Sequence, residues 1–306
     1  MTDHPISDPA VGLPAPLEAA QEPATPATPK RRRGVLGLAG WLSICWLTLV
    51  TLGAVFASWL PLDAPNRADF HYPNNAAPGV GGHLLGTDEF GQDIFSRLIY
   101  GGRVSLVVAL GVLTIGMLVG GSIGLVAGFM RGRVEALLMA VVDIFLAVPA
   151  LILLIAIVAF LGSDLKNVVI GISLVSIPAF ARIARATTLT FSQREFVLAA
   201  EAAGASRRRI LVREILPNVV LPLLAFGLLV VAIAIVAEGS LAFLGLTSPN
   251  TISWGGMING GRAALQNENV AHTAMIPAGM MFFTVLAVNF LGDRFRAAFD
   301  VKDAAL

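Results

Sequence analysis

The chain has 306 residues, of which 56% are hydrophobic and 13% are charged, and its formal net charge is +1. An average soluble domain carries about 25% charged residues, so this composition excludes an ordinary soluble domain and favours a membrane protein. Cys45 is the only cysteine, which excludes an internal disulfide and a thiolate metal cluster. The four histidines are scattered without ligand spacing, so we expect no metal site.

The first 33 residues form a polar, proline-rich segment. Seven prolines lie among many Ala and Thr residues, and the segment ends in the basic run at positions 30–33. It contains too little apolar surface to offset the entropy lost on ordering, so we predict a disordered basic cytoplasmic tail over residues 1–33. Residues 301–306 are predicted to be a short C-terminal tail.

Six long apolar runs are predicted to cross a membrane, because about 20 apolar residues suffice to span a bilayer as a helix. They cover residues 34–60, 104–130, 134–161, 167 to about 185, 215 to about 246 and 273–292. The fourth run is the shortest, and we expect Pro178 to break it. The predicted fold class is therefore all-α, a polytopic membrane domain of six transmembrane helices within residues 34–300.

Basic residues are distributed unevenly between these runs. With the N-terminus inside the cell, sixteen Lys and Arg residues lie in the inner segments and five lie in the outer ones. Cytoplasmic loops of membrane proteins carry an excess of Lys and Arg. Both termini, and the loop between the fourth and fifth runs, are therefore predicted to be cytoplasmic.

That loop contains the stretch EFVLAAEAAGASRRRILVREILPN, residues 195–218. Its first part places Phe196, Ala199, Ala200 and Ala203 on one helical face. Gly204 then interrupts the helical pattern and allows a bend at little steric cost.

The second part of the loop is strongly basic. Ser206 is a candidate cap for a short second helix that begins at Arg207 and continues through Arg208 and Arg209 to about Glu214. Such a cluster of arginines is expected to face an acidic protein surface. The alternative is that lipid phosphates or water surround it, and the residues alone leave both open.

Glu135 lies at the edge of the third apolar run, and two carboxylates, Asp143 and Glu238, lie inside the runs, where such groups suggest a function by default. We expect Asp143 to pair with Arg182 or Arg185 of the fourth run. We expect Glu238 to be shallow enough for solvation in an outer vestibule. A proton relay through these acids would make the chain an ion-coupled carrier, which is one alternative function.

Trp254, in the next outer segment, is expected to be an interfacial aromatic anchor or part of a docking surface.

A second alternative is an intramembrane serine protease. Ser173 and His272 would supply its nucleophile and base. However, Leu174 follows Ser173 where a small residue is expected, and Gly and Ser are ordinary packing residues in membrane helices. We therefore predict no catalytic residue in this chain.

The loop also resembles a known family motif. Its spacing is similar to that of the EAA loop of permease subunits of ATP-binding-cassette importers. The matching positions are Ala199 and Ala200, then Gly204 after three residues, then the segment 214–217 after nine more. Leu198 stands where that motif has its first acidic residue. Six further blocks resemble the C-type permeases of dipeptide, oligopeptide and nickel importers: HLLGTDEFGQDIFSRLIYGGRVSL, VDIFLAVP, IPAFARIAR, EGSLAFLGL, SWGGMI and NFLGDRFR.

The resemblance implies a type I importer permease fold in the bacterial inner membrane, with a coupling loop at residues 186–217. It implies a B-type permease partner, two ATPase subunits, an outer solute-binding protein and the lipid bilayer, with no nucleic acid. The chain lacks a Gly-Lys-Ser or Gly-Lys-Thr phosphate loop, so ATP and Mg are expected in the partner subunits. The substrate class it implies is dipeptides or oligopeptides, with nickel or another small solute as the alternative. The residues expected to couple to the ATPase are Phe196, Ala199, Ala200, Gly204, Arg207, Arg208, Arg209, Leu216 and Pro217.

Overall fold

The computed structural model describes residues 37–248, 250–266 and 270–303, with side chains up to residue 297. The predicted N-terminal tail lies outside these residues. The helices are α1 (Gly37–Phe56), α2 (Ile94–Ile115), α3 (Gly121–Met130), α4 (Gly132–Ala147), α5 (Ala150–Leu161), α6 (Leu165–Phe191), α7 (Glu195–Ala202), α8 (Arg207–Arg209), α9 (Leu216–Phe243), α10 (Trp254–Gly260) and α11 (His272–Asp303). Within the described residues there is no strand, only two isolated β-bridges, Ala68 with Gln92 and Thr87 with Asp93.

Five uninterrupted helical segments are long and apolar enough to cross a membrane: Gly37–Phe56, Ile94–Met130, Leu165–Phe191, Arg207–Phe243 and His272–Ala297. A π-helical turn, Gly116–Gly120, joins α2 to α3, and another, Ile210–Ile215, joins α8 to α9. The prediction of six spans holds if α4 and α5 together count as one.

The third predicted span is bent rather than straight. Its two helices, α4 and α5, meet at 86°. Val148 is extended, with φ −93° and ψ 130°, as expected for a residue before proline, and Pro149 immediately precedes the second helix. A single helix over residues 134–161 was therefore the wrong expectation.

The fourth predicted span is longer than expected. Helix α6 runs unbroken for 27 residues with Pro178 buried inside it, so the expected break at Pro178 is wrong. The last helix also exceeds its predicted range, because α11 continues to Asp303 and takes up the first half of the predicted C-terminal tail.

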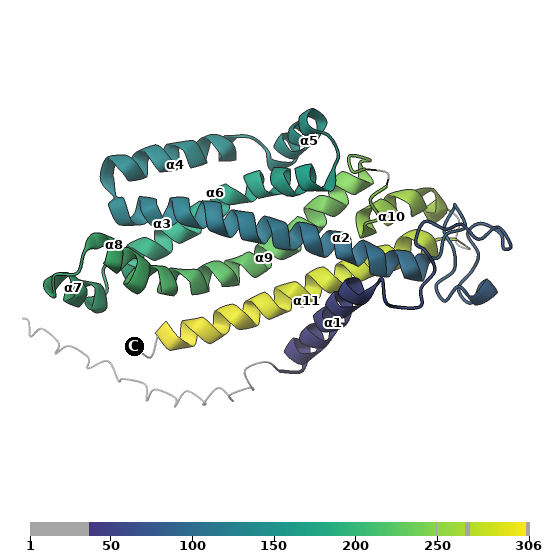
Figure 1. The fold of residues 1–306 in the computed structure, drawn as a ribbon, viewed down its shortest axis with the longest axis horizontal. Helices are drawn as coiled ribbons and strands as arrows, with labels where there is room; N and C mark the ends of the chain where they lie inside the picture. The colour runs from purple at the N-terminus through teal and green to yellow at the C-terminus, as the bar shows by residue number, and fades with distance from the viewer. Residues whose placement is uncertain (1–36, 249, 267–269, 304–306) are drawn as a thin grey trace, which may run out of the picture. The chain divides into compact units, whose positions relative to one another are not determined.

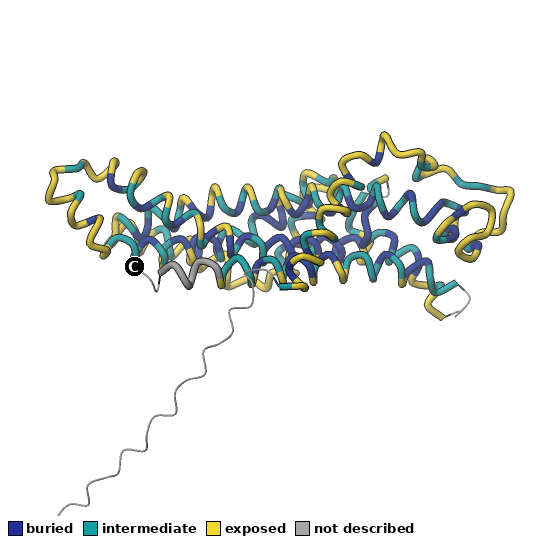
Figure 2. Tube along the Cα trace, turned by 90° about the horizontal axis from the view of Figure 1, so that it is seen from below, coloured by how far each residue is buried: buried dark blue, intermediate teal, exposed yellow. Residues whose placement is uncertain are grey.

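Close contacts between small residues hold the centre of the bundle. Gly120, Gly124 and Gly128 repeat every four residues on the segment that faces α6, and a Cβ atom at Gly124 would lie 2.1 Å from the Ala181 carbonyl oxygen. Helices in membranes pack closely through small residues at this spacing. Figure 2 shows the buried residues concentrated along the middle of the helices.

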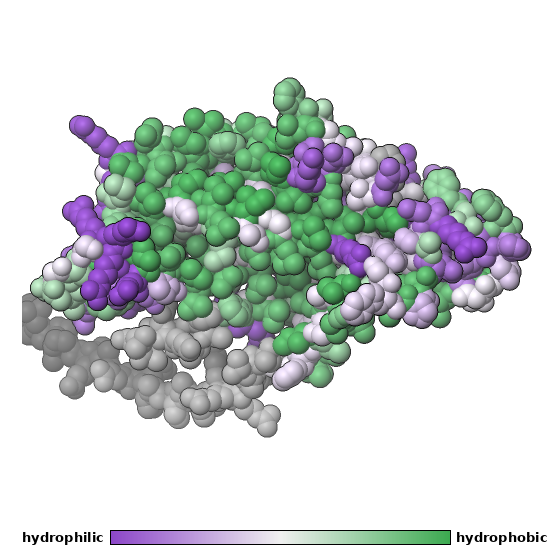
Figure 3. Space-filling view, in the orientation of Figure 1, coloured by the Kyte–Doolittle hydropathy of each residue, from purple (hydrophilic) through white to green (hydrophobic). Residues whose placement is uncertain are grey.

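The bundle has two polar ends. Helices α7 and α8 and the end of α11 lie at one end, while the segment of residues 57–93 and α10 lie at the other (Figure 1). In Figure 3, hydrophobic residues cover the middle of the visible face and hydrophilic ones gather towards both ends. This distribution is the one expected of a chain that crosses a bilayer.

Candidate functional site

The segment of residues 195–209 forms a helix, a tight turn and a second helix. Gly204 ends α7 with φ +79°, the left-handed conformation that favours glycine. The amide of Ala205 donates to the carbonyl of Ala200 at 3.0 Å, and that of Gly204 donates to Glu201 at 2.9 Å. These two bonds are the Schellman arrangement that satisfies the last carbonyls of a helix.

The second helix begins at a capping serine, as predicted. The Ser206 Oγ accepts from the Arg209 amide at 3.4 Å. From Arg207 the chain continues through the π-helical turn directly into α9, a continuous segment of 37 residues. The basic cluster is thus the first turn of a membrane-spanning helix rather than a separate short helix that ends near Glu214.

Three buried apolar side chains attach this segment to the bundle. Val197 is 2% exposed, Ile210 is 1% and Ile215 is 0%. None of these three was among the predicted coupling residues, which themselves divide by exposure. Ala200 and Leu216 are half-buried, whereas Phe196, Ala199, Gly204, Arg207, Arg208, Arg209 and Pro217 are exposed.

Two exposed apolar residues were not among the predicted coupling residues. Leu198 is 55% exposed and Val212 is 49% exposed, beside Phe196 at 39%. A polar end of the molecule that displays large apolar side chains next to arginines has the composition of a protein interface. Leu198 was noted only as a departure from the motif, although its apolar character at a polar helix end was the available signal.

A cavity of about 550 Å³ lies beside the turn. It is lined by the end of α3, the end of α6, and by Val197, Leu198, Glu201 and Arg207. Arg131, which has an unusual positive φ of 51°, donates from Nη2 to the Ser192 Oγ at 2.9 Å. This bond joins the turn between α3 and α4 to the segment that leads into α7.

Two ion pairs connect α4 to α6. Asp143 and Arg182 meet at 2.6 Å, which confirms one of the two pairings predicted from the sequence. Arg185 instead pairs with Glu135, its Nε lying 2.6 Å from Oε1. Each acid therefore has a basic partner on the neighbouring helix, as charges in a membrane generally require.

Glu238 and Trp254 lie together at the α10 end of the bundle. Glu238 is only 1% exposed and accepts a hydrogen bond from the Ser105 Oγ at 3.2 Å. Trp254 is 0% exposed, and its Nε1 donates to the carbonyl of Leu98 at 2.9 Å. The expectations of a solvated Glu238 and of an interfacial Trp254 therefore differ from the structure, in which both side chains are interior.

The segment of residues 57–93 is held together by side-chain contacts. Buried His83 lies between two carboxylates, 3.0 Å from Asp93 and 3.6 Å from Asp69. The backbone amide of His71 donates to Asp69, and this bond and that from the His71 ring hold the pKa of Asp69 below its usual value. The other Asp93 oxygen caps α2 by accepting from the Ser96 amide at 2.7 Å.

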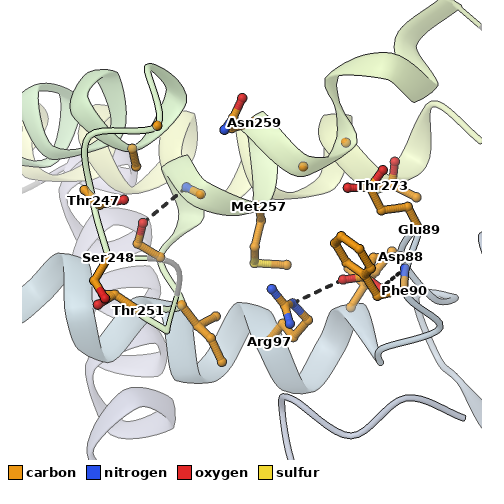
Figure 4. Close-up of a pocket in the computed structure, with 18 residues that line it drawn as sticks. Asp88, Glu89, Phe90, Arg97, Thr247, Ser248, Thr251, Met257, Asn259 and Thr273 are labelled. Atoms are coloured by element: carbon orange, nitrogen blue, oxygen red, sulfur yellow. Dashed lines mark hydrogen bonds and ion pairs between the residues drawn. The ribbon is translucent and has the colours of Figure 1, made fainter. Parts of the chain in front are cut away.

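A pocket of about 300 Å³ separates this segment from α10 (Figure 4). Arg97 of α2 projects into it and lies 3.4 Å from Asp88, while its Nη1 donates to the Pro65 carbonyl at 3.0 Å. Arg97 also bonds Gln92. These contacts tie the start of α2 to the preceding segment.

The protease alternative finds no geometric support. The Ser173 Oγ donates to the Val169 carbonyl of its own helix at 2.7 Å, and the His272 Nε2 lies 3.2 Å from the Ala76 carbonyl oxygen. Among the described residues no group of three or more His, Cys, Asp or Glu side chains forms a metal site.

Comparison with known proteins decides the family. Residues 120–302 match the family described as binding-protein-dependent transport system inner membrane component. The chain is 40% identical over 259 residues to the glutathione transport system permease protein GsiD of Escherichia coli, a match that covers 84% of each chain. The chain belongs to this family. It is a permease subunit of an ATP-binding-cassette importer.

Two further similarities agree with this family assignment. The permease is 37% identical over 307 residues to the di/tripeptide transport system permease protein DppC of Pseudomonas aeruginosa, covering 99% of this chain and 97% of that protein. A solved inward-facing structure of the MetNI methionine transporter has a TM-score of 0.55 at 19% identity, covering 66% of the permease and 95% of the matched chain. At that identity the likeness concerns the fold alone.

Membership has general consequences. A permease of this family is a multi-pass inner-membrane protein that works with a second permease, an ATPase and a binding protein. The predicted fold class, an all-α importer permease of six transmembrane helices, is confirmed, with the sixth span formed by the bent pair α4 and α5.

Proposed function

We propose that the permease is one of two dissimilar membrane subunits of a short-peptide importer, with both termini in the cytoplasm. Its partners would be a B-type permease, two ATPase subunits and an outer solute-binding protein. ATP and Mg bind to the ATPase subunits, and the permease binds no cofactor. The orientation rests on the excess of basic residues at the α7–α8 end.

The coupling role falls to the segment 186–217. The observation that carries it is the exposed surface of Phe196, Leu198 and Val212 beside Arg207, Arg208 and Arg209, on a turn fixed by Gly204. We expect the ATPase subunit to bind this surface with a groove of acidic and apolar walls. Alternating access follows if the groove contacts the segment differently in its ATP-bound and ATP-free states, because only a state-dependent difference can shift an equilibrium.

The proposed substrates are di- and tripeptides. Support comes from the two relatives, one named for glutathione, itself a tripeptide, and one for di- and tripeptides. Nickel and other small solutes are the alternative. Ion-coupled transport has less support, because Asp143 is paired with Arg182 rather than free to relay protons.

Uptake measurements test the proposed substrate class and the dependence on an ATPase. A strain that lacks the permease gene should lose uptake of a labelled dipeptide, and the native gene should restore it. If nickel uptake is lost while dipeptide uptake is unchanged, the substrate class is wrong. Uptake that persists without any ATPase subunit would refute the importer mechanism for this chain.

The coupling surface is tested by Leu198→Asp and by a triple change of Arg207, Arg208 and Arg209 to Gln. Both variants should weaken co-purification with the ATPase or separate ATP hydrolysis from uptake. Arg262→Gln is the matched control, because Arg262 is an exposed arginine at the opposite end. Equal ATPase binding in all of these proteins would exclude the proposed surface.

A further inference from the structure

An apolar groove opens between α1, α2 and α11, away from the coupling segment. Its volume is about 520 Å³, and its walls include Trp46, Gly53, Gly102, Met280 and Phe283. Every lining residue is apolar or glycine, and neither indole offers a free donor. Trp46 Nε1 donates to Thr284 at 3.1 Å, and Trp254 donates to Leu98.

The walls therefore favour a hydrocarbon occupant. A water molecule needs two to four polar partners, which these walls lack, and apolar cavities of this kind stay dry. A polar solute would lose its own hydrogen bonds on entry without replacement. The lining of the groove is apolar, like the hydrocarbon interior of a bilayer.

The length of the groove suits an acyl chain within one leaflet. Its lining runs over residues 46–54 of α1 and 275–283 of α11, each about 12 Å of helix at about 1.5 Å per residue. A length of about 12 Å fits within one leaflet of a hydrocarbon core about 30 Å thick.

A cation stands at the mouth of the groove. Arg103 follows the lining residue Gly102, and its Nε donates to the carbonyl of the lining residue Ala54 at 3.0 Å. Its Nη2 donates to Val55 and to Ser58, at the point where α1 ends. Within the part of the chain that the structure describes, Nη1 has no hydrogen-bond partner. It is therefore available for a phosphate oxygen at the membrane surface.

From this combination we infer that the groove is a binding site for one glycerophospholipid, with an acyl chain between α1, α2 and α11 and the phosphate at Arg103. Two glycines make room for the chain. A Cβ atom at Gly279 would meet nothing within 4 Å, and one at Gly53 would meet only Ile99, at 4.0 Å. The inference is independent of the transported substrate.

Photocrosslinking tests this site in the assembled transporter. The native complex is placed in nanodiscs of phosphatidylglycerol that carry a diazirine on one acyl chain, and adducts are mapped by mass spectrometry. Adducts are expected on α1 residues 46–54 and α11 residues 275–283. Gly279→Leu should fill the groove and lower their yield by about tenfold, the effect of removing room for roughly two buried methylene groups. Arg103→Gln should lower it as well.

Ala140→Leu is the matched control. It adds an isobutyl side chain in place of a methyl group, one carbon fewer than Gly279→Leu adds, on exposed α4 outside the groove, and should leave the yield unchanged. If Gly279→Leu fails to assemble, Gly53→Leu fills the same space. An unchanged yield in the filling variant, or adducts found on the partner permease and not on these segments, would overturn the inference.

Discussion

The turn at Gly204 allows a quantitative test of how the coupling segment is held. In Gly204→Ala the new Cβ atom would meet nothing within 4 Å, so the change causes no clash. The cost comes only from placing an L-residue at φ +79°, about 1–2 kcal/mol. That free energy changes the ratio of the bent to the unbent segment by a factor of about 5 to 30.

We expect Gly204→Ala to bind the ATPase subunit about 5- to 30-fold more weakly, because the same backbone strain of about 1–2 kcal/mol sets the largest possible loss of affinity. Affinity is measured by titrating purified ATPase onto the permease pair in nanodiscs, and hydrogen exchange of the Ala205 amide reports whether its bond to Ala200 still forms. Gly204→Asn should lose less than Gly204→Ala, because Asn adopts the left-handed conformation more readily.

Gly279→Ala is the control for adding a methyl group at an equally open glycine that lies in an ordinary helix. It should leave affinity unchanged. If Gly204→Ala binds the ATPase as tightly as the native protein, or if Gly204→Asn is worse than Gly204→Ala, the left-handed turn does not position the interface.

Three further predictions concern packing and ion pairing. Gly124→Ala should destabilise the permease by about 1–3 kcal/mol, seen as a lower melting temperature in detergent, because its Cβ would lie 2.1 Å from the Ala181 carbonyl oxygen. Trp254→Phe should cost about 1 kcal/mol by the same assay, through loss of its bond to Leu98, and an unchanged melting temperature would contradict this. Asp143→Asn alone should reduce the amount of folded protein in the membrane more than the double change Asp143→Asn with Arg182→Gln, because the single change leaves Arg182 without its partner; a double change that loses as much as the two single changes together would show that the pair is not coupled.

The number and order of the spans were predictable because a bilayer imposes long apolar runs that are visible in any sequence. The effect of each proline on its helix could not be predicted from the sequence. Pro178 lies inside a continuous α6, whereas Pro149 stands at an 86° bend. Membrane helices tolerate proline when neighbouring groups satisfy the freed backbone, and the sequence does not reveal which neighbours a proline will have.

The depth of a side chain along its helix was also predictable, but its burial was not. Glu238 was correctly placed near one end of its span, yet it is interior because α10 folds back over that end of α9. A Cβ atom at Gly255 would lie 2.4 Å from the Gly239 Cα, which shows how closely the two helices approach. Trp254 is buried by the same packing. Such a contact depends on tertiary structure and leaves no periodic signal.

Continuity of one helix links the two ends of the permease. From Arg207 to Phe243 the segment is 37 residues long, or about 55 Å at 1.5 Å per residue. Its first turn carries the basic cluster, and its last turns carry Glu238, which bonds Ser105 of α2. A force applied at Arg207 therefore acts directly on the helix that holds α2 and α10 at the opposite end. The α4–α5 pair, bent by 86°, is joined to α6 by two ion pairs from α4 and offers no comparable continuous connection.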